Sequence, residues 1–92
     1  MKYDIIEFLA EHNEDIVYPT DLHGAIIGVG YQFGNDPVAV LDYNKCIKIF
    51  IERDGMTHEE AVEHFDYNVI GSGIKNPPMF VHMFNKTLDK KQ

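Results

Sequence analysis

The chain has 92 residues, 45% of them hydrophobic and 25% charged, which is typical of one globular domain rather than a disordered segment. Eight basic and fifteen acidic residues give a net charge of −7, which argues against a protein that binds the phosphate backbone of duplex nucleic acid. The single cysteine, Cys46, excludes a disulfide framework and fits a reducing compartment. We therefore expect one domain over residues 1–92 in a cytoplasmic protein without a membrane span.

The N-terminal segment predicts a short helix from about Lys2 to His12. Its apolar residues fall on one side at helical spacing: Ile5, Ile6, Phe8 and Leu9. Asn13 is a suitable stop for this helix, and Pro19 and Asp21 mark a loop before the next element.

Two apolar runs separated by a turn predict a β-hairpin. The first strand is expected between Gly24 and Phe33, the turn at residues 34–37, and the second strand at Val38–Leu41. The glycines of the first strand are out of register for a dinucleotide-binding loop and do not open a helix. They are better explained as sites where a helix or another subunit approaches the sheet closely.

Two helices are predicted after the hairpin. Asp42 is suited to cap the first, which carries an apolar stripe and ends at Gly55. In this stripe Cys46 is expected to be a small, inert core residue. Thr57 and Glu60 form a capping box that begins the second helix, which is expected to run to the loop at residues 71–73.

A third strand is expected at Met79–Phe84, after the helix-blocking Pro77 and Pro78. The order α-β-β-α-α-β predicts an α+β fold, a small antiparallel sheet of about three strands with helices packed on one face. The sheet edges then need cover, which favours a homo-oligomer. From about residue 85 a basic, mobile tail is expected.

No residue pattern assigns catalysis, a metal or a cofactor. Glu60 and His64 lie four residues apart on one helix, but two ligands do not make a zinc site and Glu60 belongs to the capping box. Ser72 has no nucleophile elbow around it. We therefore expect a protein that is not an enzyme and has no catalytic residue, no metal and no cofactor.

Asn68 is the most unusual residue of the second helix. Its helical spacing places it with Ala61, Phe65 and Val69, so its amide is expected to face the core or an interface. A buried amide needs hydrogen-bond partners. Asn68 therefore either ties down the loop at residues 71–73 or lines a pocket and contacts a ligand.

The segment from Arg53 to Asn68, with the strand pair before it, resembles a family of small proteins encoded by bacteriophages and prophages. The shared features are Arg-Asp-Gly-Met at a helix end (Arg53–Met56), Glu-Glu-Ala in the next helix (Glu59–Ala61) and Phe-x-x-Asn (Phe65–Asn68). The resemblance covers about Gly24 to Val81. In place of the family's Gly-Glu-x-Thr-Pro segment stands Ile74–Pro78, which differs in sequence.

The resemblance implies a phage accessory protein that counters a host defence, in one of two ways. In the first, an oligomer sequesters a small nucleotide-type immune signal: Tyr31 or Phe33 stacks on the base, Arg53 neutralises a phosphate, and Asn68 and Ser72 supply polar contacts. In the second, the chain antagonises a host defence protein. The surface expected for that is the acidic helix face of Glu59, Glu63 and Asp66, together with the acidic N-terminus.

Overall fold

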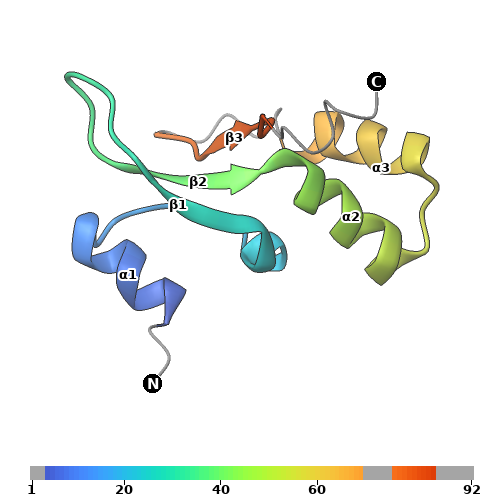
Figure 1. Ribbon diagram of the computed structural model, residues 1–92, viewed down its shortest axis with the longest axis horizontal. Coiled ribbons are helices and arrows are strands. Elements are labelled where there is room, and N and C mark those ends of the chain that lie inside the picture. The colour runs from blue at the N-terminus through green and yellow to red at the C-terminus, as the bar shows by residue number, and fades with distance from the viewer. Residues whose placement is uncertain (1–3, 70–75, 85–92) are drawn as a thin grey trace.

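Figure 1 shows the computed structural model of the chain, which describes residues 4–69 and 76–84. Helices and one small three-stranded sheet make up the fold, so the predicted α+β class and the order of its helices and strands are confirmed. The expected basic tail lies outside the described residues. Within them, no helix combines the length and the apolar character that crossing a membrane requires.

The first helix, α1 (Ile5–His12), begins where the Asp4 carboxylate accepts a hydrogen bond from the Ile6 N–H at 3.0 Å. It ends at Asn13, as predicted, and the Asn13 side-chain amide donates to the Pro37 carbonyl at 3.0 Å. This bond ties the end of α1 to the start of the second strand. The segment after α1 was expected to be a loop but contains a 3₁₀ helix, η1 (Thr20–Ala25).

The predicted hairpin is present, with β1 at Ile26–Gly30 and β2 at Val38–Asp42 in antiparallel register. The register shifts between Ile26 and Gly28, which makes a β-bulge at Ile27. A Cβ on Gly30 would lie 2.9 Å from the Val40 Cγ2, so this glycine lets the neighbouring strand approach closely. The group that approaches Gly30 is therefore a side chain of the neighbouring strand, and not a helix or another subunit.

Strand β2 passes directly into helix α2 (Tyr43–Asp54) at Asp42, which belongs to the strand and also caps the helix. Its carboxylate accepts hydrogen bonds from the N–H groups of Asn44 and Lys45, at 2.9 and 3.3 Å. Gly55 ends α2 with a φ of 71°, the left-handed conformation that glycine adopts without strain. Both predicted ends of this helix are confirmed.

Helix α3 (His58–His64) begins with the predicted capping box, since Thr57 and Glu60 each bond the other's backbone N–H. The prediction that the α-helix continues to residue 71 was wrong, because Phe65–Val69 forms a π-helical turn, η2. A π turn bonds residues five apart and inserts a residue into the helical repeat. The α-helical spacing from which the direction of Asn68 was deduced therefore does not hold there.

The third strand, β3 (Met79–Val81), pairs with β2 in parallel, so the prediction of an antiparallel sheet was wrong. The sheet has the order β1-β2-β3 and is mixed. Antiparallel neighbours can be joined by a tight turn, whereas parallel pairing needs a crossover connection. Helices α2 and α3 lie in that connection, and the chain comes back to the start of β2 before β3 begins (Figure 1).

A row of edge-to-face or tilted aromatic contacts holds β3 against the helices. Phe80 packs on Phe65 with ring centroids 4.8 Å apart, and Phe65 packs on Tyr43 at 4.9 Å. Tyr43 in turn contacts His82 at 4.2 Å, just beyond the strand. These contacts compensate for the shortness of β3, which is three residues long instead of the six expected.

The core lies on one face of the sheet. Burial alternates along β2, where Ala39 and Leu41 are buried and the other three residues are partly exposed. Every helical element adds at least one buried residue to this core: Leu9, Leu22, Ala25, Cys46, Ile47, Phe50, Ala61 and Phe65. The buried face of β2 is thus the one that the helices cover.

We expect the capping box to contribute measurably to stability. Thr57→Ala removes the oxygen that accepts the Glu60 N–H and should lower the free energy of unfolding by about 1 kcal/mol in urea titrations. Thr20→Ala is the matched control, because that exposed side chain makes no hydrogen bond with a described residue. An equal loss in both variants would contradict the assignment.

Candidate functional site

The structure does not bring Tyr31, Phe33 and Arg53, the three predicted ligand-binding residues whose side chains it describes, together in one chain. Tyr31 and Phe33 lie in the connection between β1 and β2, with Tyr31 70% exposed and Phe33 fully exposed. Arg53 lies in the last turn of α2. In Figure 1 the β1–β2 connection and the end of α2 are at opposite ends of the molecule. A site using all three side chains therefore needs more than one copy of the chain.

Arg53 is engaged with acidic neighbours. Its guanidinium donates to both carboxylate oxygens of Asp54, at 2.9 and 2.7 Å, and to the Asp21 carbonyl at 3.2 Å. These hydrogen bonds with Asp54 raise the pKa of Arg53 and lower that of Asp54. Arg53 also lies over the Phe50 ring at 5.7 Å. Its guanidinium also lies 3.5 Å from the Asp21 carboxylate. In this arrangement Arg53 links η1 to the end of α2, and a phosphate would have to compete with the carboxylates of Asp54 and Asp21.

The two remaining predicted residues are Asn68, whose backbone the structure describes, and Ser72, which it does not describe. Asn68 lies in the π-helical turn η2, and its side chain is outside what the structure describes. Ser72 belongs to residues 70–75, which also lie outside the described residues. Their roles as ligand contacts remain predictions.

The exposed side of α3 carries a hollow of about 550 Å³, called the α3 hollow below. It begins at Met56, between α2 and α3, and follows α3 into η2. The lining residues are Met56, Glu60, Glu63, His64, Asp66 and Tyr67. Of the acidic face predicted from the sequence, Glu63 and Asp66 line the hollow, Glu59 does not, and Glu60 is added.

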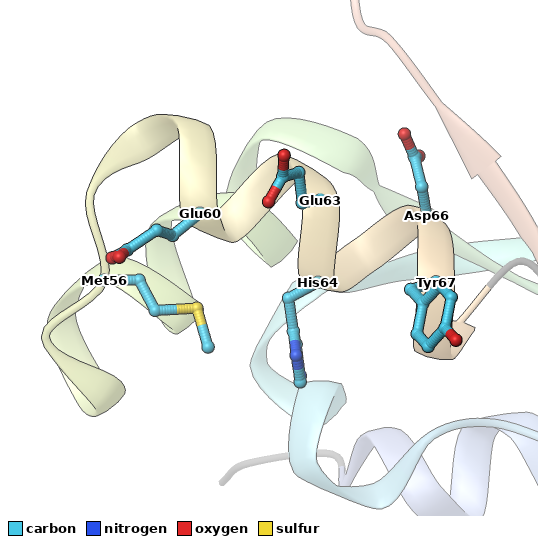
Figure 2. Close-up of a pocket in the computed structure, with 6 residues that line it drawn as sticks. All are labelled: Met56, Glu60, Glu63, His64, Asp66 and Tyr67. Carbon is cyan, nitrogen blue, oxygen red and sulfur yellow. The ribbon is translucent and has the colours of Figure 1, made fainter.

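Two rows of side chains run along the α3 hollow. Figure 2 shows Glu63 and Asp66 projecting to one side of the helix, with His64 and Tyr67 projecting to the other. Tyr67 is 86% exposed. One side of this surface is therefore acidic, and the other presents aromatic rings together with the Met56 thioether. The carboxylates do not converge on a common point, and among the described residues no three His, Cys, Asp or Glu side chains are placed to share a metal ion.

Two of these residues also have structural roles. Glu60 accepts a hydrogen bond from the Thr57 N–H at 2.9 Å, and the His64 ring packs edge-on against Phe50 at 4.6 Å. Glu63, Asp66 and Tyr67 are exposed and supply the part of the surface that is open to a partner. Sequence reasoning missed Met56 and Tyr67, although two large side chains bordering an acidic helix face are a recognisable signal.

The predicted acidic surface is divided between two parts of the molecule. Its N-terminal carboxylates Glu7 and Glu11 lie on α1, below the sheet in Figure 1, whereas α3 lies above and to the right of it. The two acidic groups therefore do not form one continuous surface. A partner protein with one flat interface would contact either the carboxylates of α1 or those of α3.

Cys46 occupies the core position that the sequence predicted. It is fully buried in α2, and burial, with a smaller contribution from the nearby Asp42 and Asp21 carboxylates, raises the pKa of its thiol to about 12. Since the thiolate is the nucleophilic form, this thiol is unreactive at neutral pH.

Comparison with protein-family models, with curated proteins and with solved structures finds no match to this chain.

The buried thiol predicts a pH dependence of stability. In the unfolded chain Cys46 ionises near its ordinary pKa of 9.0, whereas the folded chain keeps the proton up to about 12. Between these values the native state binds more protons, so stability falls as pH rises, by up to about 1.4 kcal/mol per pH unit from this group.

Urea titrations above and below pH 9.0 measure this effect. Cys46→Ala lacks the thiol and is expected to be less stable below pH 9.0, since it leaves a cavity, but to lose less stability as pH rises above that value. Parallel pH profiles for the two proteins would show that the thiol does not contribute.

Proposed function

We propose that the chain is a binding protein that antagonises a partner protein through the α3 hollow. The observation that carries the proposal is the pairing of an acidic row, Glu63 and Asp66, with an aromatic and thioether row on the same exposed helix. Protein interfaces are enriched in Tyr and Met and depend on complementary charge for specificity. A partner segment that carries Lys or Arg beside apolar side chains fits this surface.

Three physical features support this function. The carboxylates of the hollow attract a basic partner over a range of about 8–10 Å at ordinary salt, which increases the rate of encounter. The exposed Tyr67 offers a large, semi-rigid contact that loses little entropy on binding. The capping box and the packing of Phe65 in the core fix the helix that presents these groups. The resemblance to phage proteins makes a host defence protein the expected partner.

Charge reversal tests the proposal. Glu63→Lys combined with Asp66→Lys should abolish capture of a specific protein from a bacterial lysate, because the acidic row becomes repulsive to a basic partner. Glu7→Lys combined with Glu11→Lys is the matched control, since it makes the same change of charge on α1. The captured protein is then purified, and binding is measured by calorimetry.

The proposal requires that the purified partner bind the wild type and the α1 control, with a Kd that increases as salt increases, and fail to bind the α3 variant. Equal binding by all three proteins would overturn it. So would a loss of binding confined to the α1 variant.

Sequestration of a nucleotide-type immune signal by an oligomer is the second candidate. It is favoured by the two large aromatic side chains exposed in the β1–β2 connection, Tyr31 and Phe33, since every nucleobase has a face that stacks on such rings. The distance between this connection and Arg53 means that the base and phosphate contacts would come from different copies.

Calorimetry with cyclic and ADP-ribose-derived nucleotides tests the second candidate. The wild type is expected to bind one of these nucleotides. Phe33→Ala is expected to bind it more weakly, because base stacking on an aromatic ring contributes about 1–3 kcal/mol. Native mass spectrometry of the same sample should show an oligomer carrying the nucleotide. Absence of heat across the panel, or a nucleotide bound to a single chain, would contradict the candidate.

A further inference from the structure

A second hollow, of about 370 Å³, lies between the β1–β2 connection and the start of β3 and is called the hairpin hollow below. Its walls come from two segments far apart in the sequence, residues 30–38 and 76–79. The volume lies within the range of about 300–1,000 Å³ in which small-molecule sites of proteins occur. In the first segment the sequence predicted Tyr31 and Phe33 as base contacts, but these two residues do not line the hollow.

The walls of the hairpin hollow divide by chemistry. One group is apolar: Gly30, Val38, Pro77, Pro78 and Met79. The other consists of three amides and one carboxylate: Gln32, Asn35, Asn76 and Asp36. Apolar lining residues together with a few polar groups are the usual composition of a ligand site.

The four polar side chains make no hydrogen bond or ion pair with any residue in the described part of the chain, so they are available to a ligand. The Asn35 N–H bonds the Gln32 carbonyl at 2.9 Å and closes the turn that carries both amides. The Asn13 side-chain amide donates a hydrogen bond to the carbonyl of the adjacent Pro37 at 3.0 Å. Gln32, Asn35 and Asp36 thus lie on an anchored turn, and Asn76 approaches from the other segment.

The charge and the hydrogen-bonding groups of the lining residues indicate which class of ligand the hollow can bind. No lysine or arginine lines the hollow, and Asp36 is its single charged residue, so a phosphate would be repelled. A side-chain amide presents a donor and an acceptor in one plane, which matches the N6/N7 edge of adenine. The Asp36 carboxylate can accept from ribose hydroxyls, and the flat faces of Pro77 and Pro78, with the Met79 sulfur, suit a planar ring.

We propose that the hairpin hollow binds an uncharged nucleoside, with adenine as the matching base, through the amides of Gln32, Asn35 and Asn76. This inference rests on neither proposed function: it needs one copy of the chain, no phosphate contact and no partner protein. It differs from the nucleotide candidate because Arg53 and a second subunit play no part.

The test is a titration of the isotopically labelled full chain with adenosine, followed by NMR. The backbone amide signals of the non-proline residues in 30–38 and 76–79, and the side-chain amide signals of Gln32, Asn35 and Asn76, should shift with a Kd at or below about 1 mM, as expected of a small ligand in a site of this size. Adenosine 5′-monophosphate should bind more weakly, because its phosphate meets Asp36 and the net negative charge.

Two variants locate the contacts. Gln32→Ala and Asn76→Gly should each weaken adenosine binding about three- to tenfold, the loss expected for one hydrogen-bonding group. Glycine is chosen at position 76 because Asn76 has a φ of 53°, which glycine adopts without strain. Asn44→Ala, an exposed asparagine at the start of α2, is the control and should leave the Kd unchanged.

Four outcomes would overturn the inference. The first is that no amide signal shifts at an adenosine concentration several times the expected Kd. The second is that the signals that shift belong to residues outside both segments. The third is tighter binding of the monophosphate, which would show that a phosphate is recognised and would favour the nucleotide candidate. Loss of binding in the Asn44→Ala control would likewise show that the hairpin hollow is not the site.

Discussion

The architecture depends on the direct passage from strand to helix at Asp42. This residue is the last of β2, pairs with Val81 of β3 and caps α2 through two backbone N–H groups. With no loop between strand and helix, the direction of β2 sets the direction of α2. Leu41 before the junction and Cys46 after it are both fully buried, so the junction is fixed from the core side as well.

The direct passage from β2 into α2 places the α3 hollow and the hairpin hollow far apart. Because α2 extends away from the end of β2, α3 and its hollow lie at one end of the molecule, and the β1–β2 connection lies at the other (Figure 1). The α3 hollow is acidic and bordered by Tyr67, which suits a basic protein segment. The hairpin hollow is lined by amides and carries a single charge, which suits a small uncharged molecule. The two could be occupied at the same time without contact.

The sequence predicted the features that short-range chemistry determines. The Asp42 cap, the Gly55 stop and the capping box at Thr57 each follow from one residue type meeting one backbone requirement. The pairing of β3 was missed because strand direction depends on where the connection brings the chain back, which no local pattern records. The α3 hollow was half predicted: Glu63 and Asp66 were expected on the exposed helix face, whereas the place of Met56 depends on how α3 follows α2.

The parallel pairing of β3 also orders the events of folding. Contacts between β1 and β2 join residues close in sequence, and such contacts form early because little chain entropy is lost in closing them. β3 can pair only after the segment containing α2 and α3 has been drawn together, so we expect it to join β2 last. Until then one edge of β2 is open to strands of other chains, and the three residues of β3 protect the newly made protein from aggregation.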